Sequence, residues 1–253
     1  MLKNLLEIRN LSFSYHTLTG ETKVLNNISF DVRHGEFLSI VGPSGCGKST
    51  LLSLIYGMLT PEEGQIIFSG NKPPKMGYML QRDHLLNWRS IYKNTILGLE
   101  INHLLTPDNI AYVNNLINEY GLSEFKDKKP GELSGGMKQR VALIRTLALK
   151  PEILLLDEPF SALDFQTRLI VSKDISDIIR KEHKTAILIT HDISEAIRLS
   201  DKIIVLSNRP ATVKNELNIS LSGLDSSPLS YLEAPEYSSY FYNLWEDIRY
   251  EEN

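Results

Sequence analysis

The sequence predicts an α/β fold with a parallel sheet, an antiparallel β-subdomain at the N-terminus and an inserted α-helical subdomain. Three continuous apolar runs, at 37–41, 153–157 and 186–190, have the length of buried strands and alternate with helical patterns. This order is typical of a parallel sheet that is covered on both faces. A glycine-rich stretch follows the first of these runs and leads into an apolar helix, 51–56. The rest of the chain is interpreted around this stretch.

Length and composition point to an ordinary globular protein. The chain has 253 residues, 42% of them hydrophobic and 23% charged, with a net charge of −4. This balance does not predict broad affinity for nucleic acid, so no nucleic-acid partner is expected. The single cysteine excludes an internal disulfide. No apolar run approaches the roughly 20 residues that span a bilayer, so any membrane role is expected to be peripheral.

Residues 5–41 alternate apolar and polar positions, with breaks at 19–21 and 33–35. A period of two predicts mainly antiparallel strands here. Tyr15 ends the first run, where it is either a half-buried packing residue or a platform for an adenine ring. Periodicity does not separate these two interpretations.

The glycine-rich stretch between strand and helix predicts a phosphate-binding loop. Glycines let successive backbone N–H groups converge on phosphate oxygens, and the helix N-terminus favours negative charge. Lys48 is expected to reach the β- and γ-phosphates, and the Ser49 hydroxyl to bind Mg²⁺. Cys46 is interpreted as a small residue without a redox role. The expected nucleotide-binding residues of the loop are Gly42, Pro43, Ser44, Gly45, Cys46, Gly47, Lys48, Ser49 and Thr50.

A turn at 60–64 and a short strand at 65–68 follow the first helix, and a second break at 72–75 comes before 77–81. From about 88 to 149 the apolar spacing becomes helical, which predicts an inserted subdomain. Pro107 and Gly121 bound one of its helices, as start and stop signals do.

Two acidic residues and a histidine follow later strands. Asp157 and Glu158 end the apolar run at 153–157, and His191 follows the run at 186–190. Triphosphate hydrolysis needs a carboxylate that helps to hold Mg²⁺ and a group that polarises the attacking water. Asp157 suits the first role and Glu158 the second. His191 lies where an open α/β sheet presents its ligand crevice, so we expect it to contact the γ-phosphate.

The stretch from Leu133 to Arg140 opens another helix, with Ser134 as a suitable N-cap and glycines that leave N–H groups open to a phosphate. The chain already contains one phosphate loop, so this second site calls for a second nucleotide or a partner molecule. Beyond residue 212 the pattern weakens. Residues 221–230 are interpreted as a linker, and 235–250 as a docking helix with Tyr237, Phe241, Leu244, Trp245 and Ile248 at helical spacing.

Taken together, these motifs resemble the ATP-binding subunits of ABC transporters, and the resemblance covers nearly the whole chain. The loop at 42–50 resembles Walker A, Leu133 to Gln139 the ABC signature, and Ile153 to Glu158 Walker B. The residues that the resemblance adds or assigns are Gln81 (Q-loop), Ser161 to Asp164 (D-loop), Glu158 (catalytic carboxylate), His191 (switch histidine) and Tyr15 (adenine stacking).

This resemblance implies a P-loop NTPase core of the ABC ATPase type, ATP and Mg²⁺ as cofactors, and a head-to-tail dimer of two copies. Lys48, Gln81, Glu158 and His191 would be catalytic, and Ser49, Gln81 and Asp157 would hold Mg²⁺. The signature residues Ser134, Gly135 and Gly136, together with Asp164, would contact nucleotide. The implied organisation is a single ABC ATPase domain over 1–253. Its parts are 1–87 (β-subdomain and first part of the core), 88–149 (helical), 150–212 (second part of the core) and 213–253 (C-terminal extension).

A narrower resemblance rests on 80–89, on the Gly-Gly-Met form of the signature and on 207–210. These stretches are similar to the importer branch for nitrate, sulfonate, taurine and bicarbonate, although Asn87 stands where proline is expected. The resemblance implies a peripheral subunit at the cytoplasmic face of the membrane, bound to an integral permease that an extracytoplasmic solute-binding protein serves. In the helical block, Trp88 and Ile91 are expected to anchor the permease, unless Trp88 is a core residue.

Three alternatives remain open from the sequence. The chain could be a soluble ABC-type ATPase of DNA repair or translation, a non-catalytic regulatory subunit, or an importer subunit for a thiamine-precursor pyrimidine. The compact helical block, without a long coiled coil, and the single ATPase unit argue against the first. Intact Lys48, Asp157, Glu158 and His191 argue against the second.

Overall fold

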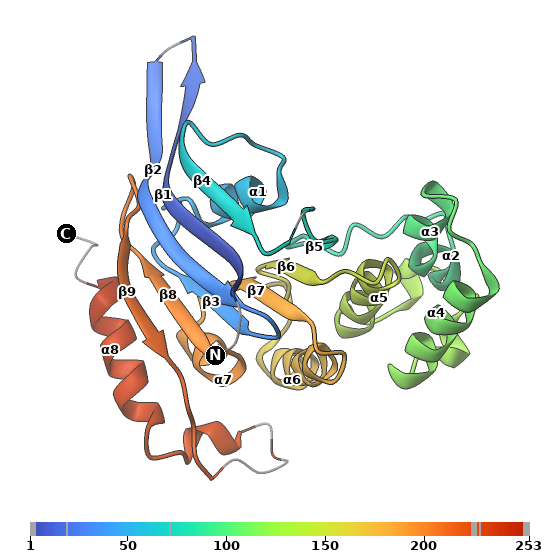
Figure 1. Cartoon of the computed structure of the whole chain (residues 1–253). Coiled ribbons are helices and arrows are strands. Elements are labelled where there is room, and N and C mark those ends of the chain that lie inside the picture. Colours follow the sequence, from blue (N-terminus) through green and yellow to red (C-terminus); the bar gives the residue numbers. More distant parts are fainter. Residues whose placement is uncertain (1–3, 19, 71, 224–226, 228, 250–253) are drawn as a thin grey trace. The chain divides into compact units, whose positions relative to one another are not determined.

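The computed structural model describes residues 4–18, 20–70, 72–223, 227 and 229–249, and the chain divides into two compact units (Figure 1). The first unit joins the two ends of the chain, Met1–Pro74 and Ile179–Asn253. The second unit is the middle of the chain, Lys75–Ile178. Within the described ranges no helix is long and apolar enough to cross a membrane.

The first unit contains an antiparallel sheet and a predominantly parallel one. Its elements are β1 (Asn4–Thr17), β2 (Gly20–Arg33), β3 (Phe37–Val41), α1 (Lys48–Tyr56), β4 (Glu63–Phe68), β7 (Thr185–Ile189), α7 (Ile193–Leu199), β8 (Lys202–Leu206), β9 (Val213–Asn218), η3 (Ser230–Leu232) and α8 (Tyr237–Arg249).

The N-terminal strands form the predicted antiparallel subdomain. β1 lies between β2 and β4 and pairs antiparallel with both. Leu6, Ile8 and Leu11 are buried on β1, and Ile28 and Val32 on β2. Leu6 and Ile8, like Ile28 and Val32, are spaced as the alternating pattern predicts, whereas Leu11 follows a register shift between β1 and β2. The period of two therefore identified part of the buried face.

The strand that precedes the phosphate loop lies at the centre of its unit. β3 pairs parallel with β7 on one side and with β8 on the other, and Ile40 lies opposite both Ile189 and Ile204. All five residues of β3 and all five of β7 are buried. Such continuous burial is the reason these strands read as unbroken apolar runs rather than as alternating ones.

The structure adds an edge strand that the sequence pattern did not indicate. β9 pairs antiparallel with β8, and its side chains alternate between half-buried and exposed. Only Val213 and Leu217 among its six residues are apolar, so its periodicity is weak. The interpretation that the pattern simply weakens after residue 212 was incomplete.

The C-terminal helix does dock on its unit, as predicted, but not with all the residues expected. Leu244 of α8 is fully buried, and Tyr237, Tyr240, Phe241 and Ile248 pack against the same cluster. Trp245 is 49% exposed and therefore does not share this role. The predicted linker at 221–230 lies partly outside the described residues.

The second unit contains the helical block and one pair of parallel strands. Its elements are β5 (Met76–Met79), α2 (Ile91–Thr95), α3 (Leu97–Ile101), α4 (Pro107–Glu119), η1 (Ser123–Phe125), η2 (Pro130–Glu132), α5 (Gly135–Leu147), β6 (Ile153–Asp157) and most of α6 (Phe165–Lys181).

The ends of α4 are as the sequence signals predict. Pro107 is its first residue, the Thr106 hydroxyl accepts a hydrogen bond from the Asn109 N–H at 3.3 Å, and Gly121 follows the helix with φ +67°. Proline costs nothing at that first position because its missing N–H would have no partner inside the helix. Glycine tolerates positive φ because it has no Cβ.

The two expected permease anchors have opposite environments. Trp88 is 74% exposed, which excludes the interpretation that it is a core residue. Ile91 is fully buried at the start of α2, so the expectation that it is a surface anchor was wrong. Its spacing with Thr95, Ile96 and Leu99 marks the inner face of α2 and α3, and all three are buried as well.

Candidate nucleotide-binding and catalytic site

The phosphate loop has a backbone that side chains would not permit. It leaves β3 at Val41 and enters α1 at Lys48. Gly47, at the N-cap of α1, has φ +122°, and a Cβ there would lie 2.7 Å from Val24 Cγ1. The Gly47 carbonyl accepts a hydrogen bond from the Leu51 N–H at 2.9 Å, but Gly47 has no side chain that could cap the N–H groups before Leu51. The N-terminus of α1 therefore keeps the partial positive charge that attracts a phosphate.

Lys48 lies over its own loop. Its Nζ donates hydrogen bonds to the carbonyl oxygens of Gly42 at 2.8 Å and Pro43 at 2.9 Å, and the residue is 6% exposed. The side chain is therefore ordered before any ligand arrives. A phosphate oxygen in the loop would meet a preorganised cation, which is how charge stabilisation is obtained at low reorganisation cost.

Tyr15 lies beside the helix that the loop opens. Its hydroxyl lies 3.3 Å from Thr50 Oγ1, and its ring packs edge-on against Phe13 at a centroid distance of 5.0 Å. The residue is still 42% exposed. A ring that is fixed at its edge and open elsewhere fits a stacking platform better than a buried packing residue.

His191 lies at the sheet edge where the loop begins. β7 and β3 are neighbouring parallel strands, and the Thr190 N–H donates to the Ile40 carbonyl at 3.4 Å. His191 follows directly and is exposed, while Asp192 caps α7 through the Glu195 N–H at 3.1 Å. The first unit therefore brings Lys48 and His191 to the carboxyl ends of adjacent strands, where open α/β sheets bind ligands.

The second unit brings its acidic residues and Gln81 together in the same way. β5 and β6 are parallel, with Met79 opposite Leu156, so Gln81 and Glu158 follow neighbouring strand ends. Gln81 Nε2 donates to Glu158 Oε2 at 3.4 Å and to Ser161 Oγ at 3.3 Å. The Tyr78 hydroxyl donates to Asp157 Oδ2 at 3.3 Å. Carboxylate and amide oxygens thus gather at one edge of this strand pair.

Glu158 has an unusual backbone conformation. Its φ is +45°, in the left-handed region that residues with a Cβ rarely adopt. A turn holds it, because the Ser161 N–H at 3.2 Å and the Ser161 hydroxyl at 2.9 Å both donate to the Glu158 carbonyl. Strain of this kind persists only where the surroundings determine the conformation, and it gathers at functional sites.

Ser134 caps α5 as predicted, because its hydroxyl accepts a hydrogen bond from the Met137 N–H at 3.3 Å. The next two positions leave little room for side chains. A Cβ on Gly136 would lie 3.0 Å from both Thr167 Cγ2 and Val171 Cγ2, and a Cβ on Gly135 would lie 3.0 Å from Leu163 Cδ2. Gly135 is exposed, so backbone groups at this helix start are accessible to a ligand.

Asp164 has a local role that the sequence reasoning did not anticipate. It precedes α6, and its Oδ1 accepts a hydrogen bond from the Thr167 N–H at 3.0 Å. This contact lowers the pKa of the Asp164 carboxyl, because the charged form accepts the bond better. Asp164 is therefore the N-cap of α6. Any contact with nucleotide would be an additional role.

The sequence did not indicate that two arginines of α5 connect parts of this unit. Arg145 donates to the carbonyl oxygens of His84 at 2.8 Å and Asp83 at 2.6 Å, which fixes the segment after Gln81 to the signature helix. Burial lowers the pKa of the Arg145 guanidinium. No sequence signal distinguishes Arg145 from an ordinary helical arginine.

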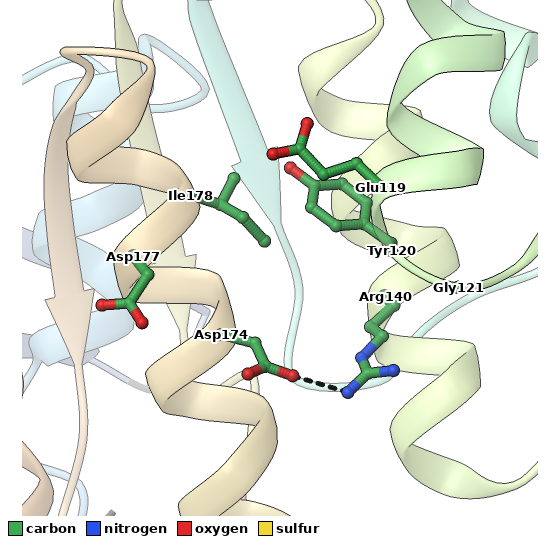
Figure 2. A pocket seen from close by; sticks show the side chains of 7 residues that line it. All are labelled: Glu119, Tyr120, Gly121, Arg140, Asp174, Asp177 and Ile178. Carbon is green, nitrogen blue, oxygen red and sulfur yellow. Dashed lines mark hydrogen bonds and ion pairs between the residues drawn. The ribbon is translucent and has the colours of Figure 1, made fainter. Parts of the chain in front are cut away.

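Arg140 connects α5 to α6. It donates to Asp174 Oδ2 at 2.6 Å and lines a cavity of about 390 Å³ (Figure 2). The other residues of this cavity are Glu119, Tyr120, Gly121, Asp177 and Ile178, none of them predicted site residues. Its position at the end of the signature stretch could have drawn attention to Arg140.

Comparison with known proteins gives one consistent result. The sequence model of the ABC transporter family matches residues 25–161. The chain is 42% identical to the ABC transporter ATP-binding protein YtlC of Bacillus subtilis, over 96% of this chain and 95% of that protein. It is 37% identical to the taurine import ATP-binding protein TauB of Roseobacter denitrificans, over 92% and 89% of the two chains. It is 38% identical to the nitrate import ATP-binding protein NrtD of Synechocystis, over 88% and 85%.

Comparison with solved structures also identifies an ATP-binding cassette. The chain is similar to the ATP-binding cassette MJ0796, solved as a dimer in a post-hydrolysis state with ADP and inorganic phosphate. The TM-score is 0.73 and the identity 28%, over 87% of this chain and 100% of that one.

Proposed function

Because the chain belongs to the ABC transporter family, as a subunit of its ATP-binding type, we propose that it powers uptake of a small anionic or zwitterionic solute through a separate membrane permease. The relatives favour this function over repair and translation, since TauB and NrtD are named as import proteins. Two groups of contacts carry the catalytic part of the proposal. The preorganised Lys48 loop and the Gln81–Glu158 pair provide, in one chain, a phosphate-binding group and an acidic group for hydrolysis.

The proposed mechanism assigns each residue a role at a stated atom. ATP binds with its phosphates in the loop at 42–50 and its adenine over Tyr15. Glu158 polarises the attacking water through a carboxylate oxygen, and Gln81 orients that carboxylate. The Lys48 ammonium and the His191 ring stabilise the negative charge that develops on the γ-phosphate. Ser134, Gly135 and Gly136 of a second copy close the site from the opposite side.

Mg²⁺ fits the residues assigned to it. Ser49, Gln81 and Asp157 offer a hydroxyl, an amide and a carboxylate oxygen, which are the hard ligands that Mg²⁺ prefers. Among the described residues no group of three or more His, Cys, Asp and Glu side chains could hold a metal. A cation bound by few protein groups and by nucleotide phosphates needs no such cage. When bound, Mg²⁺ neutralises phosphate charge.

The solute class follows from the relatives and not from the chain. Taurine and nitrate, the solutes named for TauB and NrtD, are both small and carry a negatively charged oxyanion group. We assign the same class, which includes bicarbonate and other sulfonates, to this transporter, with thiamine-precursor pyrimidines as the alternative to test. A solute-binding protein outside the membrane would deliver the solute, and this subunit would lie at the cytoplasmic face.

The substitution Glu158→Gln tests the catalytic assignment. Glutamine keeps the size and the hydrogen-bonding edge but cannot polarise water as a carboxylate does. We expect ATP to bind as in the wild type and the hydrolysis rate to fall by about 10²–10³-fold. Nucleotide affinity and phosphate release are measured on the same preparation, with Glu152→Gln, at an exposed glutamate directly before β6, as the matched control. Near wild-type turnover in Glu158→Gln would contradict the assignment.

A further inference from the structure

The C-terminal helix α8 presents an outer face on which Tyr242 and Trp245 stay exposed, while Tyr237 and Phe241, which also pack against the buried cluster, complete the group of rings. Aromatic rings of Tyr237, Phe241, Tyr242 and Trp245, together with Ser238, line a hollow of about 430 Å³ on this face. Tyr242 is 64% exposed and Trp245 is 49% exposed. Phe241 and Trp245 stack with centroids 6.3 Å apart and an angle of 11° between the rings. We call these four aromatic residues the outer aromatic face.

The helix is held in place by other contacts. Leu244 is fully buried on the inner side. The hydroxyl groups of Tyr237 and Ser194 lie 2.9 Å apart, which ties the start of α8 to α7. Near its end, Asp247 accepts hydrogen bonds from Asn215 Nδ2 at 2.7 Å and, through its carbonyl, from Lys214 Nζ at 2.6 Å. Tyr242 and Trp245 therefore add little to docking, and contiguous exposed rings of this size mark an interaction surface.

The charge of this part of the chain restricts what can cover the face. Residues 229–253 contain six acidic residues and a single basic one, Arg249, which gives a net charge of −5. The whole chain carries −4, so residues 1–228 carry +1. The net negative charge of the protein thus falls in the last 25 residues of the sequence, the segment that includes α8. A second copy of this helix or an anionic lipid surface would be repelled, whereas a positively charged partner would be attracted.

Aromatic rings favour the same kind of partner. Lysine and arginine side chains bind over the faces of tryptophan and tyrosine, and the acidic surroundings strengthen that preference. Cytoplasmic segments of integral membrane proteins are enriched in lysine and arginine. We propose that the outer aromatic face binds a basic, amphipathic cytoplasmic segment of the permease. This inference rests on the proposed function, which supplies the membrane partner.

The first experiment uses the full-length chain and its own fluorescence. The protein has two tryptophans, so Trp88→Phe leaves Trp245 as the reporter. The probe is a synthetic amphipathic peptide of leucine and lysine. We expect saturable binding with a blue shift of Trp245 emission, weakened by salt. Absence of binding, or equal binding of the peptide with glutamate in place of lysine, would overturn the proposal. A comparable shift with anionic-lipid vesicles would also overturn it.

Substitutions test whether the peptide binds at the outer aromatic face or elsewhere on the surface. In the Trp88→Phe background, Tyr242→Ser should weaken peptide binding by about tenfold or more, since exposed interface aromatics carry much of the binding energy. Tyr242→Phe should retain binding. Ile101→Ser, at an exposed residue of α3, is the matched control and should leave binding unchanged. Because Tyr242 lies outside the buried cluster, its loss should not unfold the chain. Equal binding by Tyr242→Ser and Tyr242→Phe would contradict the proposal.

The second experiment identifies the occupant in the assembled transporter, purified in detergent with its permease. A photoreactive benzoylphenylalanine in place of Tyr242 should cross-link to a lysine- and arginine-rich permease segment. Cross-links only to the second ATPase copy, or none to the permease, would overturn the inference. ATP hydrolysis by the same preparation distinguishes failure of this inference from failure of the proposed function. A hydrolysing complex without this cross-link leaves the proposed function standing, whereas a chain that neither hydrolyses ATP nor copurifies with a permease refutes both.

Discussion

Glu158 is the residue at which the proposed chemistry and an unfavourable backbone conformation coincide. Its carboxylate is hydrogen-bonded to Gln81, and its φ of +45° is one that a side chain disfavours. The two turn bonds from Ser161 hold this conformation. A strained conformation that its surroundings hold in this way is typical of functional positions.

This strain gives a stability prediction. Glu158→Gly and Glu158→Ala both remove the carboxylate, but only glycine relieves the positive φ. We expect the glycine variant to be more stable towards unfolding than the alanine variant by about 1 kcal/mol, with both inactive. Urea denaturation of the two variants measures the difference. An alanine variant as stable as the glycine variant would show that the conformation carries no strain.

Lys48 gives a prediction about binding. Removing the ammonium in Lys48→Ala takes away a cation that the Gly42 and Pro43 carbonyls already hold over the loop. We expect ATP affinity to fall by about 100-fold or more, because a desolvated cation next to phosphate is worth several kcal/mol. Fluorescent-nucleotide titration measures it, with the exposed Lys23→Ala as control. Unchanged affinity would remove Lys48 from the site.

At this scale the sequence identified the residue types but not their local roles. The spacing from Gly42 to Thr50 predicts a phosphate loop because few other structures need those glycines. The capping bond of Asp164 and the positive φ of Glu158 depend on turns between β6 and α6, where no periodicity applies. These features could not be predicted.

Among the elements, α5 carries the most connections in its unit. Ser134 caps its start, Arg140 pairs with Asp174 of α6, and Arg145 holds the carbonyls of Asp83 and His84. The segment after Gln81 is therefore attached to the helix whose N-terminus we assign to the partner's nucleotide. This attachment gives a physical route by which dimer closure and the position of Gln81 depend on one another.

Arg145→Met tests that route. Loss of the two hydrogen bonds should free the segment after Gln81, so we expect kcat to fall while KM for ATP changes little. Arg145→Lys, which retains the charge but not the forked geometry, should recover part of the rate. The control is Arg82→Met, an exposed residue of the same segment. A general loss of stability with equal changes in kcat and KM would indicate a purely structural role.

The elements themselves were predicted unevenly. Strands buried on both faces and helices with clear end signals, such as α4, follow from the sequence because burial and capping leave strong patterns. β9 does not, since an edge strand with two apolar residues owes its existence to pairing with β8. The exposure of Trp88 and the burial of Ile91 also required the structure, because hydrophobicity alone does not say which residue faces outward.

At the scale of the molecule, each compact unit contains part of the set of residues that we propose for catalysis. The first holds the phosphate loop, Tyr15 and His191, and the second holds Gln81, Asp157, Glu158 and the signature. The order of these motifs along the chain could be predicted from the sequence alone. We propose that the permease and the binding protein select the solute, so this sequence does not identify it.

Dimerisation gives a prediction for the whole protein. If each ATP lies between two copies, a monomer lacks the signature that completes its site. We therefore expect hydrolysis per subunit to rise with protein concentration until the dimer is saturated. Light scattering under the assay conditions measures the oligomeric state alongside turnover. Constant turnover in a verified monomer would contradict the shared site.

The central claim is that each ATP is cleaved between the loop of one copy and the signature of the other. Mixing two inactive variants tests this claim most directly. Lys48→Ala lacks a working loop, and Ser134→Glu lacks a working signature, so neither should hydrolyse ATP alone. In mixed dimers one of the two composite sites is intact. We predict that mixing equal amounts restores activity to about a quarter of the wild-type value, since half of the dimers are mixed and carry one good site. A mixture that stays as inactive as its components, although mixed dimers form, would contradict the account.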